Sequence, residues 1–141
     1  MASNGSINTI LGMGTKRERN IQLAHAVLDW NRAHLRHDAL LTETQVRQCF
    51  GEDFIVEPNG RHYRADVANY LEFLNGMRAT MAGIEYRVIH TVADDDGVVL
   101  DMAVQIAHTD GRREDFIAML LMHFDAKDKV SLWKETYLSR A

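Results

Sequence analysis

The chain has 141 residues, of which 46% are hydrophobic and 26% are charged, and this size and balance are typical of one domain with one core. Sixteen Lys and Arg against twenty Asp and Glu leave a formal net charge of -4, which disfavours binding to nucleic acid or to an anionic membrane surface. Charges interrupt every apolar run before the roughly 18 residues that a membrane span needs. The single cysteine, Cys49, excludes an intramolecular disulfide, and without a charged-then-apolar leader we expect a cytoplasmic protein.

The first half of the sequence predicts helices. Residues 1–15 are rich in Gly, Ser and Asn, and we expect a flexible arm there, followed by a single domain over residues 16–141. From Lys16 to His37 apolar residues recur at spacings of three and four, which predicts an amphipathic helix. A short helix from Thr42 to Cys49 begins with a Thr-x-x-Gln pattern that resembles a capping box, and Asp66 to Met77 is a third helix.

Alternating periodicity then predicts strands. Asp53 to Glu57 is a brief strand that a Pro-Asn-Gly turn signal stops. Four further strands are predicted over Ile84–Ala93, Val98–His108, Arg113–Phe124 and Val130–Ser139. Aspartate- and glycine-rich turns separate them, which is typical of an antiparallel meander. Three helices followed by a meander imply the α+β class, with the helices covering one face of an antiparallel sheet.

The turns between these strands predict which side chains share a face. With Asp95 and Asp96 at the centre of the first turn, His90 lies opposite Asp101. The same counting through the later turns collects one largely apolar face that contains Tyr86, Val88, His90, Val99, Asp101, Ala103, Gln105, Phe116, Ala118, Leu120, Met122, Trp133, Glu135 and Tyr137. Because a buried charge costs several kcal/mol unless it is paired or wet, this face predicts the wall of a pocket better than a sealed core.

The opposite face of the meander is also apolar. It is predicted to contain Ile89, Leu100, Met102, Val104, Ile106, Ile117, Met119 and Leu121. The predicted helices are too few to cover both faces of the sheet, so we expect a homodimer that forms sheet to sheet.

The order of the elements, with the strings CFGEDFIVEPNG, HTDGRREDF and FDAKDKVSLWKETY, resembles the nuclear transport factor 2-like superfamily, in particular its SnoaL-like polyketide cyclases and steroid delta-isomerases. The resemblance covers residues 16–139. It implies a cystatin-like fold in which three N-terminal helices cover a cone-shaped, curved antiparallel sheet and enclose a deep apolar cavity, usually in a dimer. Since the superfamily contains both enzymes and non-catalytic binding proteins, the resemblance implies the fold more strongly than the reaction.

Two carboxylates match acid/base positions of the enzymes that this sequence resembles. Steroid delta-isomerases place a general-base aspartate just before a proline in the first strand, where this chain has Glu57. SnoaL-like cyclases place an aspartate five positions after the apolar residue that opens the last strand, and counting from Val130 reaches Glu135. The oxyanion pair of the isomerases falls on Trp30 and Leu120, which cannot donate hydrogen bonds in the same way, so the isomerase mechanism itself is not implied.

The residues by themselves favour two catalytic groups. Glu135 in an apolar cavity would have its charged form desolvated, which raises its pKa toward neutrality and suits it to proton transfer. Asp101 bonded to one imidazole nitrogen of His90 would leave the other nitrogen free to take a proton. Each assignment has a structural alternative. Glu135 could form an ion pair, or it could face outward if the last strand slips by one residue. His90 and Asp101 could form a buried pair without a catalytic role, and Glu57 could be a solvated loop residue.

Further side chains are expected to line the cavity, although such residues more often simply pack in a core. They are Trp30, Tyr63, Tyr70, Tyr86, Gln105, Phe116, Leu120, Met122, Trp133 and Tyr137. No HxH, HExxH or GxxxxGK[ST] pattern is present, so we expect neither a metal nor a nucleotide cofactor. The leading hypothesis is a cofactor-independent lyase, isomerase or cyclase that binds a small apolar molecule, and the alternative is a non-catalytic ligand-binding or dimerisation module.

Overall fold

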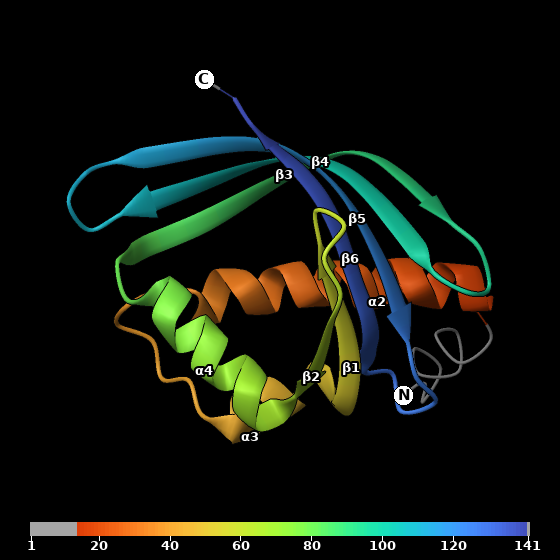
Figure 1. Cartoon of the computed structure of the whole chain (residues 1–141). Coiled ribbons are helices and arrows are strands. Elements are labelled where there is room, and N and C mark those ends of the chain that lie inside the picture. Colours follow the sequence, from red (N-terminus) through yellow and green to blue (C-terminus); the bar gives the residue numbers. More distant parts are fainter. Residues whose placement is uncertain (1–13, 141) are drawn as a thin grey trace, which may run out of the picture.

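The computed structural model describes residues 14–140, which form three helices and one six-stranded sheet (Figure 1). The helices are α2 (Lys16–His34), α3 (Glu43–Arg47) and α4 (Val67–Arg78). The strands are β1 (Phe50–Pro58), β2 (Tyr63–Asp66), β3 (Met81–Ala93), β4 (Val98–His108), β5 (Arg113–Phe124) and β6 (Val130–Ser139). The α+β class is therefore confirmed. The arm expected over residues 1–15 lies, apart from its last two residues, outside the described residues.

Capping side chains set where the helices begin. Thr15 and Glu18 form a capping box at the start of α2, and the side chain of Asp66 accepts a hydrogen bond of 2.8 Å from the Asn69 amide at the start of α4. Helix α2 ends at His34, not at the predicted His37, because Leu35 leaves the helical conformation with φ -84° and ψ 63°. The side chain of Leu35 is buried, so the chain turns inward at this point.

The strands are ordered β2-β1-β6-β5-β4-β3. Strand β1 runs parallel to β6, and the other neighbouring pairs are antiparallel, so the sheet is mixed. The sequence did not predict β2, which is only four residues long. The sheet curves over α2, which packs against β3, β4 and β5, while α4 lies toward β1 and β2 (Figure 1). The concave side of the sheet therefore faces the helices.

The hairpin between β3 and β4 has the predicted register only near its turn. His90 lies opposite Asp101, as predicted, but a bulge between Val88 and His90 shifts the remaining pairs by one residue. Tyr86 consequently lies opposite Val104 and not opposite Gln105.

The predicted register between β4 and β5 is wrong by one residue. Gln105 lies opposite Asp115 and not opposite Phe116. The loop between these strands holds three residues and not two: the amide of His108 donates to the carbonyl of Arg112 over 2.8 Å, and Gly111 has a φ of +89°. A three-residue hairpin loop ends on a residue in this left-handed conformation, which glycine adopts without strain.

This shift reverses the faces of β4. Leu100, Met102 and Val104, which were predicted on the outer face, are buried under the helices, and Asp101 lies on the outer face instead. The predicted pairing of Leu120 with Glu135 between β5 and β6 is confirmed. The inward faces of β5 and β6 are therefore the predicted ones.

The core lies toward one end of the space between the sheet and α2. Leu28 of α2, Leu100 and Met102 of β4, and Leu120 and Met122 of β5 are 0% exposed there. Burying side chains of this size stabilises a fold by about 1.5–3 kcal/mol each. In residues 14–140, no helix is long and apolar enough to cross a membrane.

Candidate active site

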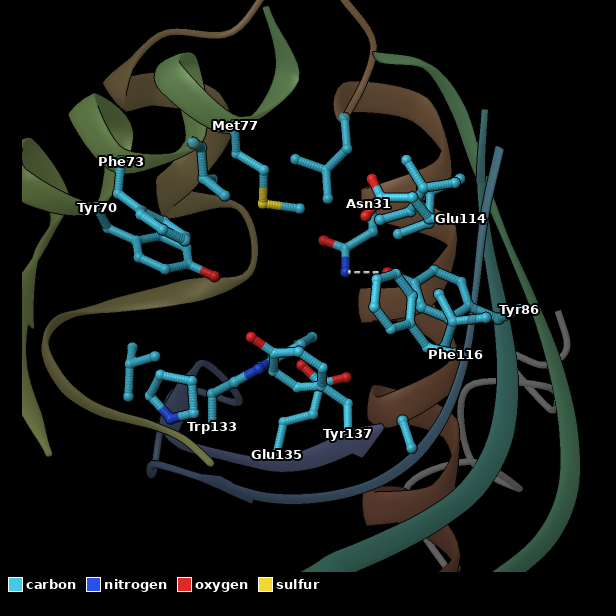
Figure 2. Close-up of a pocket in the computed structure, with 18 residues that line it drawn as sticks. Asn31, Tyr70, Phe73, Met77, Tyr86, Glu114, Phe116, Trp133, Glu135 and Tyr137 are labelled. Carbon is cyan, nitrogen blue, oxygen red and sulfur yellow. Dashed lines mark hydrogen bonds between the residues drawn. The ribbon is translucent and has the colours of Figure 1, made fainter. Parts of the chain in front are cut away.

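A cavity of about 280 Å³ lies at the other end of the same space, between the concave face of the sheet, the end of α2 and the inner side of α4 (Figure 2). It is lined by Asn31, Leu35, Val56, Pro58, Tyr70, Phe73, Leu74, Met77, Ile84, Tyr86, Val104, Ile106, Glu114, Phe116, Ala118, Trp133, Glu135 and Tyr137. Most of these side chains are apolar or aromatic, and two are carboxylates. An apolar cavity with a few converging polar groups is the usual form of a small-molecule site.

Six of the residues singled out in the sequence lie on the cavity wall. They are Tyr70, Tyr86, Phe116, Trp133, Glu135 and Tyr137. All but Tyr70 come from the meander, where the alternation of side chains along each strand points them inward.

Five predicted lining residues lie elsewhere. Trp30 is buried between α2 and α3, where its indole N–H donates to the carbonyl of Gln45 over 3.0 Å. Leu120 and Met122 are fully buried in the core, Tyr63 is exposed on β2, and Gln105 lies on the outer face of β4. These differences arise because the cavity occupies only part of the inward face, and because the register of β4 differs from the predicted one.

His90 and Asp101 form the predicted pair but not in the predicted place. His90 Nδ1 lies 2.8 Å from Asp101 Oδ2, and the His90 side chain is 73% exposed. Both residues lie on the outer face of the sheet, since the inward positions of β4 are occupied by Leu100 and Met102. The pair is therefore separated from the cavity by the sheet itself.

Glu57 also lies outside the cavity wall. Its neighbours Val56 and Pro58 line the cavity, so the alternation along β1 turns Glu57 to the other side. There its Oε2 lies 2.6 Å from Nδ1 of His62.

Glu135 is the predicted acid/base residue that the structure brings into the cavity. Desolvation by the surrounding side chains raises its pKa from the ordinary 4.5 to about 7, and contact with the Trp133 indole opposes this shift. Within residues 14–140, no Lys, Arg or His forms an ion pair with Glu135. Glu135 is therefore able to hold or release a proton near neutral pH.

The Pro-Asn-Gly turn after β1 holds the strand that carries Glu135. The amide of Asn59 donates to the carbonyl of Glu135 over 2.8 Å, and its side-chain oxygen accepts from the amide of Tyr137 over 2.8 Å. Asn59 has a φ of 48°, a left-handed conformation that asparagine tolerates better than most residues. The turn that the sequence predicted thus also fixes β6 on both sides of Glu135.

Hydroxyl groups face the same cavity from two sides (Figure 2). The Nδ2 group of Asn31, which is 5% exposed, donates to the hydroxyl oxygen of Tyr86 over 2.8 Å. Since that oxygen already accepts a hydrogen bond, the hydroxyl hydrogen of Tyr86 is available to a ligand. Burial raises the pKa of Tyr70 and of Tyr86, so both hydroxyls stay protonated at neutral pH. The sequence signal for Asn31 is a polar residue at helical spacing on the buried side of α2.

Glu114 is a second carboxylate on the wall, and it is absent from the predicted site residues. Its Oε2 lies 2.5 Å from Nε2 of His108, whose side chain is only 8% exposed. Strand alternation carried the necessary signal, because Glu114 lies two residues before Phe116 and so shares its face.

Residues 14–140 contain no cluster of three or more His, Cys, Asp or Glu that would hold a metal ion. Burial raises the pKa of the Cys49 thiol to about 11, so this thiol stays protonated at neutral pH and is a poor nucleophile. The chemistry of the cavity wall is therefore that of carboxylates, hydroxyls and one carboxamide.

Comparison with family models and with curated proteins finds no match, whereas solved structures resemble the whole fold. An LEH-like epoxide hydrolase from M. tuberculosis has a TM-score of 0.69 at 17% identity, over 89% of this chain and 82% of that one. A SnoaL-like polyketide cyclase from Jannaschia sp. CCS1 has a TM-score of 0.67 at 12% identity, covering 89% and 88%. The epoxide hydrolase/cyclase-like enzyme SalBIII has a TM-score of 0.66 at 13% identity, covering 86% and 92%.

These similarities define the fold of the chain. It is the α+β fold that the resemblance to the nuclear transport factor 2-like superfamily implies, and it is shared with these enzymes and with a structure titled as an NTF2 design. At identities of 12–17%, the similarity extends to the fold and not to a particular reaction. The fold is compatible with an enzyme, since the similar structures include a cyclase and an epoxide hydrolase.

Proposed function

We propose that this protein is a cofactor-independent enzyme that transfers a proton on a small, largely apolar carbonyl or hydroxyl compound, with Glu135 as the acid/base group. One observation carries this proposal: Glu135 lies on the wall of an apolar cavity with its pKa raised to about 7 and with no cationic partner in residues 14–140. A general acid/base works best when its pKa lies near the working pH. Lyases, isomerases and cyclases all use such a step.

The other polar groups of the cavity suit the second half of this chemistry. When Glu135 removes a proton next to a carbonyl group, negative charge develops on the carbonyl oxygen. The Tyr86 hydroxyl, whose oxygen is held by Asn31 Nδ2, offers its hydrogen to that oxygen. We assign no part in the transfer to His90, Asp101 or Glu57, because the first two lie on the outer face of the sheet and the third points away from the cavity.

The size of the cavity limits the substrate. Ligand sites usually have volumes of about 300–1,000 Å³, and this one, at about 280 Å³, lies just below that range. The named activities of the similar structures, polyketide cyclisation and epoxide hydrolysis, also concern organic molecules and support the choice of an enzyme. We therefore favour a compound of one or two fused rings.

Exchange of hydrogen for deuterium next to a carbonyl group tests this proposal without knowledge of the natural substrate. The protein is incubated in D₂O with a panel of cyclic ketones, and proton NMR follows the loss of the signal from the hydrogens next to the carbonyl group. We expect the wild type to accelerate exchange as the pH rises through about 7, where Glu135 loses its proton. Glu135→Gln should lower the rate by about 10²- to 10⁴-fold. Glu72→Gln, on the exposed side of α4, is the matched control.

Glu57→Gln decides between the two carboxylates that the sequence singled out. If Glu57 abstracts the proton, this variant loses activity and Glu135→Gln keeps it, which would reject the assignment.

A non-catalytic binding protein is the second candidate. It is favoured by Trp30 and Leu120, the positions on which the oxyanion pair of the isomerases falls in the sequence. Both side chains are buried in the core and do not line the cavity. Saturable binding of the panel without exchange would support it.

We also propose that the protein forms a homodimer through the outer face of the sheet. Large apolar side chains are 44–67% exposed there, namely Ile89, Val92, Ile117, Met119 and Leu138. An apolar patch of this kind on a soluble domain usually marks an interaction surface. A self-complementary sheet face would bury it with twofold symmetry.

A further inference from the structure

The carboxylate of Glu114, on the cavity wall away from Glu135, helps to determine which molecules the cavity binds. Glu135 lies opposite Leu120, and Glu114 lies six residues before Leu120 on the same inward face of β5. At about 3.3 Å per residue, this corresponds to about 20 Å along the strand, and side chains on a concave face converge from such positions. In Figure 2, Glu114 lies on one side of the hydrogen-bonded pair of Asn31 and Tyr86, and Glu135 lies on the other side with Trp133 and Tyr137. The cavity thus has a carboxylate on each side of the Tyr86 hydroxyl group.

His108 orients Glu114. Its Nε2 lies 2.5 Å from Glu114 Oε2, and its Nδ1 lies 3.1 Å from the hydroxyl oxygen and 3.3 Å from the carbonyl oxygen of Thr80. Both ring nitrogens are therefore engaged, and the ring is nearly buried. Since His108 occupies one carboxylate oxygen, the other oxygen of Glu114 is left to accept a hydrogen bond from a ligand.

The charges around the cavity select among ligand classes. None of the side chains on its wall is Lys, Arg or His within residues 14–140, so nothing there compensates a ligand carboxylate or phosphate. Outside the wall, Arg112 Nη1 lies 3.9 Å from Glu114 Oε2, next to the His108 contact. The Arg112 guanidinium partly offsets the charge of Glu114, which favours a neutral donor over a cation.

We propose that Glu114, oriented by His108, binds a hydroxyl group at the end of the substrate remote from Glu135, so that the cavity takes neutral, hydroxyl-bearing apolar molecules and rejects anions. This inference rests on the proposed function, because it assigns the substrate class of the same site. Glu114 is a binding residue and His108 is a positioning residue.

A matched series of bicyclic ketones tests the proposal. 6-Hydroxy-1-tetralone carries a carbonyl group at one end and a hydroxyl group at the other, and its 6-methoxy, 6-aminomethyl and 6-carboxy analogues change only that second group. Binding is measured by calorimetry and from the tryptophan fluorescence, to which Trp133 on the cavity wall contributes together with the buried Trp30. A hydrogen bond to a charged group corresponds to about 10- to 100-fold in affinity. We expect the wild type to prefer the hydroxyl compound to the methoxy compound by this factor, and to bind the carboxylate most weakly.

Variants separate the roles of the residues. Glu114→Gln and His108→Leu should abolish the preference for hydroxyl over methoxy, whereas His108→Gln, which keeps a donor near Glu114, should retain part of it. Circular dichroism shows whether each variant folds, and Glu114→Asp provides a second, more conservative change if Glu114→Gln does not. Equal binding of the hydroxyl and methoxy compounds by the wild type, an unchanged preference in Glu114→Gln, or tighter binding of the aminomethyl compound would overturn the proposal.

This test is independent of catalysis. Glu135→Gln should lose deuterium exchange and keep the preference for the hydroxyl group. Loss of exchange with an intact preference reports on the proposed function, and loss of the preference in Glu114→Gln, measured by binding alone, reports on Glu114. The two proposals therefore fail separately.

Discussion

Replacing Glu135 with glutamine changes the pH dependence of folding, and this effect requires no substrate. The carboxyl group has a pKa of about 7 in the folded protein and an ordinary value of 4.5 when solvated. An acid with a raised pKa binds its proton more tightly in the folded state. The contribution of Glu135 to the free energy of unfolding is therefore close to zero below pH 4.5. It becomes increasingly unfavourable as the pH rises toward 7, and it stays constant above pH 7.

The magnitude follows from these two values. Their difference, at 1.36 kcal/mol for each pKa unit, corresponds to about 3 kcal/mol of stability that the wild type loses between pH 4.5 and pH 8 through Glu135 alone. The Glu135→Gln variant has a neutral group of the same size and does not suffer this loss. We therefore expect the variant to gain about 3 kcal/mol relative to the wild type over this range, or roughly 10 °C in Tm.

Urea denaturation at intervals from pH 4.5 to pH 8 measures this difference. Other groups titrate alike in both proteins, so the free energy of unfolding of the variant minus that of the wild type isolates Glu135. Glu72→Gln, at an exposed position, should show a constant difference across the series. A constant difference for Glu135→Gln as well would mean that this carboxylate is solvated, and would refute both its burial and its role as a proton carrier.

Two further predictions concern the strand that carries the site and the outer face of the sheet. Asn59→Ala removes the acceptor for the Tyr137 amide and places alanine at a φ of 48°, so it should destabilise the protein by about 1–3 kcal/mol in urea denaturation and lower deuterium exchange by displacing Glu135. Stability and exchange that both match the wild type would contradict the role of this turn. Met119→Lys places a charge in the exposed apolar patch and should convert the proposed dimer to a folded monomer in light scattering. A wild type that is itself monomeric at working concentration would reject the interface.

Local features of the sequence were sufficient for much of the fold. Helical spacing from Lys16 onward, the capping pattern at Thr42 and the turn signals of the meander each act within a few residues, and the corresponding elements are present. The predicted pairing of Leu120 with Glu135 is also present, although a bulge between His123 and Phe124 shifts the register next to the turn. The inward position of Glu135 follows from this pairing and from the alternation of side chains along β6.

Other features depended on details that a single sequence does not contain. A loop of three residues at Asp110-Gly111, and a bulge near Ile89, each move the register by one position, and one position exchanges the two faces of a strand. This is why Asp101 and Gln105 were expected inside and lie outside. The parallel pairing of β1 with β6 joins segments far apart in the chain, with no turn to predict it.

The sequence by itself determined the order of the three helices and the four meander strands and the α+β class, and it favoured the inward position of Glu135, because periodicity and turn chemistry act locally. Only the tertiary structure decided where the inward face is a solid core and where it is hollow. It placed Leu120 and Met122 in the solid core, and Glu114, Asn31 and Glu135 on the wall of the hollow part. The volume enclosed by a curved sheet depends on how far the helices stand from each of its ends, and that distance results from packing among segments remote in the chain.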